Sequence, residues 1–268
     1  MRIMRAALAG AVVLSTAAIF VPGASAQSAS ARIHLIHGIP ATDVDVEVGG
    51  QNVFTGFKFG ETKDLSSFAG QTLTGLKVKA AGTSTVAIDA GNVALPASGN
   101  YTVLANLDAS GTPKLSVFQN DTSAIAAGKG RLVVRHTAAA PGVDIRANGA
   151  VAFAGVVNGQ EGKADLDAGT VSADVVAAGT SGPAVIGPAN LSVKNGESLI
   201  VYAVGALANN SLTVLTESIT GLGATPAAVQ TGNSPVDNGG SSLPLAAAVF
   251  GSLIIAGSAT LLVRRQKA

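Results

Sequence analysis

The feature that most constrains this chain is an internal repeat. Residues 32–60 align without a gap on residues 131–159 when the sequence is shifted by 99 positions. The identities include Arg32/Arg131, His37/His136, Val44/Val143, Asp45/Asp144, Gly50/Gly149, Phe54/Phe153, Gly56/Gly155 and Gly60/Gly159. Two of the chain's three histidines therefore hold one equivalent position. Self-similarity of this kind predicts two copies of one domain, over residues 27–126 and 127–223.

Composition limits the chemistry of these two domains. The chain has no cysteine, so disulfides, thiolate catalysis and cysteine metal ligands are excluded. Residues 27–242 carry 12 basic and 16 acidic side chains, a formal net charge of −4, and they contain no basic run. A mildly acidic segment of this kind is not typical of a nucleic-acid-binding protein, so we expect no nucleic-acid partner.

Short segments of alternating polarity predict the fold class. In residues 44–48 three valines alternate with Asp45 and Glu47, and the Gly49-Gly50 pair that follows is typical of a hairpin turn. Further strands are expected over 32–37, 52–59, 76–80, 101–107 and 114–118, and in the second copy over 131–136, 143–147, 150–157, 171–177, 198–204 and 212–215. We therefore predict an all-β protein with two tandem antiparallel β-sandwich domains of the Ig-like kind. Residues 61–75 are compatible with a loop, a short helix or an edge strand.

The first 26 residues have the three regions of a secretory signal peptide. Arg2 and Arg5 precede an apolar run over residues 6–21, and a Pro-Gly break leads to the small-residue site Ala24-Ser25-Ala26. We expect cleavage after Ala26 and export of the chain that follows. The alternative is an uncleaved N-terminal anchor.

The C-terminal part of the sequence predicts attachment to a membrane. Residues 224–242 are rich in Thr, Pro, Gly, Asn and Ser, which is typical of a flexible stalk. Residues 243–263 carry no charge, and as a helix they would span about 31 Å, close to the roughly 30 Å of a bilayer core. The basic tail 264–268 favours a cytoplasmic end, which leaves both domains outside the cell. The alternative is a cell-wall anchor processed by a sortase, although residues 243–247 lack the Thr-Gly pair that a sortase cleaves.

The repeated histidine and aspartate are the strongest candidates for a functional site. A carboxylate can hold an imidazole in one tautomer, and the available pairs are His37 with Asp45 and His136 with Asp144. No nucleophile recurs beside these pairs. We therefore interpret the histidines as structural groups that bond the following turn or the nearby aspartate, and we expect no catalytic residue and no cofactor.

Arg32 and Arg131 occupy the first position of the aligned segments. Because an arginine and an aspartate recur together, we expect each arginine to pair with Asp45 or Asp144 of its own copy rather than to remain a solvated charge.

A metal site is conceivable in the first copy, where His34, His37, Asp43 and Asp45 are close in sequence. The second copy has valine and glycine in place of His34 and Asp43, so the two copies share only one histidine and one aspartate. That number of ligands is too small for zinc, and we expect no metal.

The first copy contains a motif whose parts follow in this order: Arg32, His37, a turn with Pro40, Val44-Asp45-Val46, Gly49-Gly50 and Phe54-Thr55-Gly56. This pattern resembles the uncharacterised domain-of-unknown-function family 4397, and the resemblance extends over residues 31–222. It implies exported, often duplicated β-domains of bacterial surface proteins. It supplies no activity and no catalytic residues. In the second copy the proline of the turn is shifted by two places.

These features predict a non-enzymatic cell-surface protein that is anchored in the membrane and binds an unknown protein or glycan of the cell envelope, or serves a structural or adhesive role there. The alternative is an extracytoplasmic hydrolase or metal-dependent enzyme that uses the His/Asp pair of each copy. A membrane-anchored sensor is a third hypothesis, weakened by the five-residue tail.

Overall fold

The computed structural model describes residues 30–224 of the 268-residue chain. These residues form an all-β structure of sixteen strands and one short 3-10 helix, which confirms the predicted fold class. Within residues 30–224 no helix is both long and apolar enough to cross a membrane. The predicted signal peptide (1–26), transmembrane helix (243–263) and basic tail (264–268) lie outside the described residues, as does the predicted stalk after Ala224.

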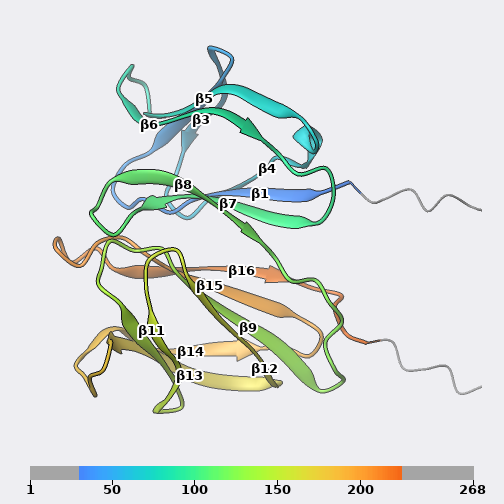
Figure 1. Cartoon of the computed structure of the whole chain (residues 1–268), viewed down its shortest axis with the longest axis vertical. Coiled ribbons are helices and arrows are strands. Elements are labelled where there is room, and N and C mark those ends of the chain that lie inside the picture. Colours follow the sequence, from blue (N-terminus) through green and yellow to red (C-terminus); the bar gives the residue numbers. More distant parts are fainter. Residues whose placement is uncertain (1–29, 225–268) are drawn as a thin grey trace, which may run out of the picture. The chain divides into compact units, whose positions relative to one another are not determined.

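We call the first eight strands repeat one (Figure 1). They are β1 (Arg32–His37), β2 (Val44–Val48), β3 (Gln51–Phe57), β4 (Thr62–Asp64), β5 (Thr72–Ala80), β6 (Val86–Ala94), β7 (Asn100–Leu107) and β8 (Pro113–Gln119). The 3-10 helix η1 (Ser66–Phe68) lies between β4 and β5. The segment 61–75, for which three structures were expected to be possible, thus contains an edge strand, a short helix and the start of β5.

We call the next eight strands repeat two. They are β9 (Lys129–His136), β10 (Val143–Ala147), β11 (Ala150–Val156), β12 (Glu161–Asp167), β13 (Gly169–Ala177), β14 (Ala184–Val193), β15 (Ser198–Val204) and β16 (Thr213–Ile219). Strands β10 and β11 lie 99 residues after β2 and β3 at both ends. The alignment found in the sequence therefore corresponds to equivalent strands in the structure.

Each repeat contains two four-stranded sheets of the same topology. The strand orders are β4-β1-β7-β8 and β3-β2-β5-β6 in repeat one, and β12-β9-β15-β16 and β11-β10-β13-β14 in repeat two. Most strand pairs are antiparallel, as predicted, but β1 pairs with β7 in parallel and β9 pairs with β15 in parallel. A parallel pair needs a long connection, and the five intervening strands provide one.

Three strands escaped the sequence analysis: β6, β12 and β14. Strand β6 contains Gly91, which has a φ of 61° and interrupts the register with β5, so a strand interior there looks like a turn in the sequence. Strand β14 contains Pro188 and lies at the edge of its sheet, where a missing N–H breaks no ladder.

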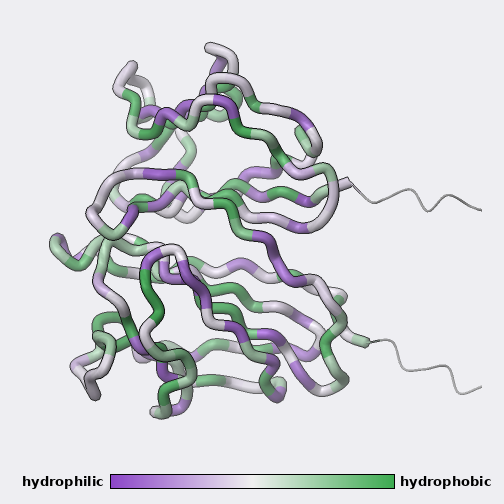
Figure 2. The backbone as a smooth tube through the Cα atoms, viewed as in Figure 1, coloured by the Kyte–Doolittle hydropathy of each residue, from purple (hydrophilic) through white to green (hydrophobic). Residues whose placement is uncertain are grey.

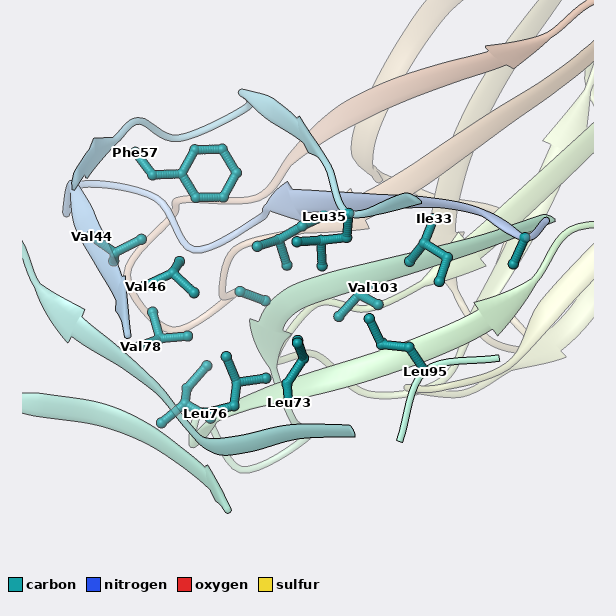
Figure 3. Close-up of a cluster of buried hydrophobic side chains, with 14 residues drawn as sticks. Ile33, Leu35, Val44, Val46, Phe57, Leu73, Leu76, Val78, Leu95 and Val103 are labelled. Carbon is teal, nitrogen blue, oxygen red and sulfur yellow. The ribbon is translucent and has the colours of Figure 1, made fainter. Parts of the chain in front are cut away.

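The core of repeat one lies between its two sheets. Ile33 from β1 lies beside Val103 and Leu95 at one end of the cluster, Leu35 lies in the middle, and Val44, Val46 and Phe57 lie at the other end (Figure 3). Hydrophobic and hydrophilic residues alternate along these strands (Figure 2), so one face of each sheet is buried in the core. Repeat two has an equivalent cluster that includes Leu132, Val143, Ile145, Val175 and Val201.

A third apolar cluster joins the two repeats. Ile36 and Leu104 from repeat one pack with side chains of β9 and β15, namely Val133, Ile200, Tyr202 and Val204. These side chains lie on the faces of β1, β7, β9 and β15 opposite to the two internal cores. The repeats are therefore in direct contact through one sheet of each.

Candidate functional site

The two repeated histidines end their strands and are almost completely buried. His37 is 0% exposed and His136 is 2% exposed. In repeat one the Nε2 of His37 lies 2.6 Å from the carbonyl oxygen of Thr42, and Nδ1 lies 3.4 Å from the backbone nitrogen of Ile39. Since a carbonyl can only accept and a backbone N–H can only donate, the ring carries its proton on Nε2.

His136 makes the same two contacts in repeat two. Its Nε2 lies 2.9 Å from the carbonyl oxygen of Pro141, and the backbone N–H of Ala138 points at Nδ1 over 3.4 Å. Burial lowers the pKa of both histidines, and in each ring the hydrogen bond to the turn carbonyl opposes this effect. Each histidine thus spans the turn that follows its strand as a neutral group.

The repeated aspartates hold a different part of the backbone. Asp45 accepts hydrogen bonds from the backbone N–H of Gly56 (2.8 Å) and of Gly82 (3.0 Å). Asp144 accepts from Gly155 (2.7 Å) and Gly179 (2.8 Å). These N–H donors lower the pKa of both carboxyl groups, with Gly56 and Gly155 as the larger contributors.

The glycines that bond the aspartates have backbone conformations that need them. Gly56 and Gly155 have φ angles of 60° and 64° and lie where β3 and β11 slip in register against β2 and β10. A residue with a side chain is strained at such an angle. The Val-Asp and Phe-x-Gly parts of the repeated motif are therefore two halves of one local structure, a bulged strand fixed by a carboxylate.

The predicted contact between each histidine and its aspartate is not formed. Both oxygens of Asp45 and of Asp144 bond backbone N–H groups, and both ring nitrogens of His37 and of His136 face their own turn. The interpretation of the histidines as groups that bond the turn agrees with this geometry. A base-activating arrangement of histidine and aspartate does not agree with it, because no carboxylate orients either imidazole.

The predicted pairing of the arginines is also wrong. The guanidinium of Arg131 lies 2.8 Å from Asp165 and 3.0 Å from Asp121, and not at Asp144. Arg32 is exposed, and within residues 30–224 it forms no ion pair with Asp45. The backbone donors leave Asp45 and Asp144 no need of a cationic partner.

No group of three or more His, Asp or Glu side chains in the described part of the chain is placed to hold a metal ion. His34 and Asp43, the additional candidate ligands of repeat one, lie in different surroundings. His34 contacts Glu217 of repeat two at 2.7 Å, whereas Asp43 is exposed in the turn after β1.

A polar network between the repeats was missed by the sequence analysis. Glu217, on β16, accepts hydrogen bonds from the hydroxyls of Thr102 and Tyr202 at one oxygen, both over 2.7 Å. Its other oxygen lies 2.7 Å from Nδ1 of His34. Its side chain is only 8% exposed, so three groups from three strands surround a buried carboxylate.

Arg135 extends this network through repeat two. It is 1% exposed, its Nε lies 2.8 Å from Glu161, and it donates to the hydroxyl of Tyr202 over 2.9 Å. Its guanidinium carbon lies 4.4 Å from the ring centre of Phe118 in repeat one. Burial and the carboxylate of Glu217 raise the pKa of Tyr202, so its hydroxyl stays a donor. The available signal in the sequence was Arg135 itself, a charged residue directly after the apolar residues 132–134 and at the position where repeat one has Ile36.

An open hollow lies beside the turn of repeat one. It is lined by Ala41, Thr42, Asp43, Phe59, Ala80 and Ala81. In repeat two glycine replaces Asp43, and Val157 reaches to 3.2 Å from the position that a Cβ would take on Gly142. The two repeats therefore share the turn but differ in the surface around it.

The fold and these contacts define a class: a duplicated all-β protein whose repeated histidine and aspartate fix backbone turns. Residues 31–146 match the model of the family described as a domain of unknown function, DUF4397. The matched segment covers repeat one and β9 and ends within β10, so the resemblance noted in the sequence is confirmed there and stays a prediction for residues 147–222. No curated protein matches the chain.

Proposed function

We propose that this chain is a non-enzymatic cell-surface protein with two tandem Ig-like β-sandwich domains, used for binding or for a structural or adhesive role at the cell envelope. The N-terminal signal peptide and the helix 243–263 predicted from the sequence would place the repeats outside the cell and keep them attached to the membrane. The partner would be a protein or glycan of the envelope.

The observation that supports this proposal is that the repeated polar side chains form hydrogen bonds with the backbone. His37, His136, Asp45 and Asp144 direct their polar atoms at backbone groups within their own repeat. Residues that recur in both copies thus serve the shape of the domain. The contact between the repeats adds to this argument, because a protein that presents a surface away from the membrane benefits from domains that pack on one another.

The enzyme alternative depends on the same residues. A general base removes a proton from the substrate, so its acceptor nitrogen must be free and must lie within hydrogen-bond reach of that proton. The Nδ1 of each histidine instead faces a backbone N–H, and Nε2 already donates to a carbonyl. No contact of the described residues favours a second candidate function.

The placement can be tested with the full-length chain in its native host. Intact cells are treated with a protease, and the remaining peptides are identified by mass spectrometry with and without permeabilisation. We expect peptides from residues 30–224 to be lost from intact cells while the chain fractionates with the membrane. Protection of these peptides until permeabilisation would contradict the surface location, and release of the intact chain into the medium would contradict the anchor.

The role can be tested on the same cells by chemical crosslinking followed by capture of the chain. A binding or adhesive role predicts reproducible crosslinks from the repeats to an envelope component. A variant in which His37 and His136 are both replaced by glutamine distinguishes the alternative, because glutamine offers a hydrogen-bond donor and acceptor but no base. Loss of a hydrolytic activity in this variant, with the protein still folded, would support the enzyme.

A further inference from the structure

The turn after β1 and the turn after β9 are each bridged by a single neutral imidazole. In repeat one the ring of His37 donates to Thr42 at one side of the turn and accepts from Ile39 at the other. In repeat two His136 does the same with Pro141 and Ala138. The sequence between the bridged residues differs in the two repeats, but the bridge is the same.

Protonation is incompatible with this bridge. A second proton would be placed on Nδ1, where it would point at the N–H of Ile39 or Ala138 instead of accepting from it. The resulting charge would also be buried, since the two rings are 0% and 2% exposed, and an unpaired buried charge is strongly disfavoured. The charged ring can reach water only if the turn moves away from it.

The charged surroundings of the two rings differ. Asp43 and Glu61 lie near His37 and favour its protonated form. The equivalent positions of repeat two hold Gly142 and Gln160, and no charged side chain acts on His136. The rings of Phe57 and Phe59 also lie near His37, at 5.7 Å and 6.4 Å, and carry no charge, and the Nζ of Lys63 lies 5.4 Å from the centre of the Phe57 ring.

We propose that these two turns open when their bridging histidine is protonated, and we call each turn with its histidine a latch. The latch of repeat one opens at a higher pH than the latch of repeat two. In repeat one the latch also forms part of a surface feature, because Ala41, Thr42 and Asp43 line the hollow beside Phe59. Acidification therefore changes the shape of this hollow before it changes the rest of the protein. The proposal does not depend on the function proposed above.

Hydrogen exchange on the full-length chain tests this directly. Exchange is followed by mass spectrometry between pH 7.5 and pH 4.5, after correction for the intrinsic pH dependence of amide exchange. For a one-proton opening we expect the exchange of peptides that contain Ile39 to rise by up to about tenfold per pH unit once protonation begins. Peptides that contain Ala138 should show the same rise at a lower pH. Equal behaviour of the two turns, the reverse order, or no change at either turn would overturn the proposal.

The repeats provide their own matched variants. Asp43→Asn with Glu61→Gln removes the two carboxylates, and the glutamine can keep the bond that Glu61 accepts from the N–H of Lys58, because Gln160 accepts the same bond from Val157. We expect this variant to move the opening of turn one toward the pH at which turn two opens. Gln160→Glu should move the opening of turn two to a higher pH. An unchanged order in both variants would refute the electrostatic part of the proposal.

A second readout does not require the variants to fold well. The chain has three histidines, so three imidazole signals are expected in the NMR spectrum of the wild-type protein labelled at histidine. Assignment uses His34→Gln and His136→Gln, each of which removes one of the three signals and leaves His37 in place. We expect the His37 signal to titrate at a higher pH than the His136 signal. Coincident titration, or titration of either ring without faster exchange of its turn, would show that the bridge is not a latch.

Discussion

The Nδ1 of His34, in repeat one, lies 2.7 Å from Oε1 of Glu217, in repeat two. Glu217 takes the position of Phe118 in the other repeat, 99 residues earlier, and Phe118 in turn packs against Arg135 and Tyr202. At this shared position repeat two thus contacts repeat one with a carboxylate, whereas repeat one contacts repeat two with an aromatic ring. The two repeats thus present different side chains at equivalent positions, and these side chains fit the opposite repeat in different ways.

Replacing Glu217 by glutamine should destabilise the contact between the repeats. Glutamine keeps one acceptor oxygen but loses the charge that receives hydrogen bonds from Thr102 and Tyr202, and it replaces the carboxylate oxygen that contacts Nδ1 of His34. Because hydrogen bonds to a charged group contribute more than neutral ones, we expect a loss of about 2 kcal/mol in the free energy of unfolding. Urea denaturation measures this value. The control is Thr216→Ala, an exposed neighbour on β16, which should change the stability by less than about 0.5 kcal/mol.

Replacing Arg135 by alanine should cost more. The side chain is buried, and its removal leaves the hydroxyl of Tyr202 and the carboxylate of Glu161 without their cationic partner. Breaking a buried pair from one side typically costs about 3–5 kcal/mol, and we expect the lower end because Glu161 is 36% exposed. Lys129→Ala removes the exposed pair with Asp167 and should cost less than about 1 kcal/mol. Similar losses in both variants would contradict the importance given to burial.

The repeat made much of this fold predictable. His37 and Asp45 were chosen because they recur with His136 and Asp144, and all four proved to hold equivalent backbone turns. Their partners could not be predicted, because they are backbone N–H groups of glycine, isoleucine and alanine and backbone C=O groups of threonine and proline, and nearly every residue offers such groups. An aspartate and an arginine in one repeat look like an ion pair in the sequence even when the backbone supplies the donors.

The contact between the repeats could not be predicted by the same reasoning. Alternation in a strand shows that two faces differ, but a strand such as β9 is buried on both faces, with Leu132 in the core of repeat two and Val133 against repeat one. In the sequence such a strand shows consecutive apolar residues, here 132–134, and Arg135 follows them directly. What this arginine contacts depends on strands from the other repeat, which the sequence does not place.

The repeated aspartates should make the protein sensitive to strong acid. Backbone N–H donors lower the pKa of Asp45 and Asp144 in the folded state, so these groups stabilise the fold fully above the unfolded value of about 3.9 and lose that contribution as the pH falls through the folded value. In Asp45→Asn with Asp144→Asn we therefore expect a lower urea midpoint at pH 7 and a smaller further decline between pH 4 and pH 2.5. Asp89→Asn, at a carboxylate that bonds only the nearby N–H of Gly91, serves as the control. A double variant as acid-sensitive as the wild type would show that the loss comes from other carboxylates.

Gly130, at the start of β9, offers a test of packing that the repeat itself suggests. The equivalent residue of repeat one is Ala31, which is buried without difficulty, so alanine at position 130 looks harmless in the sequence. In the structure a Cβ on Gly130 would overlap the carbonyl oxygen of Lys194 and lie 2.7 Å from Val193, and backbone cannot move aside as a side-chain tip can. We expect Gly130→Ala to lower the free energy of unfolding by about 2 kcal/mol. Gly169→Ala, on β13, would place a Cβ in open space and should be neutral or slightly stabilising, because alanine loses less chain entropy on folding. Equal stability of the two variants in urea denaturation would mean that the turn at Lys194 yields, and that the two repeats tolerate the same residue at this position.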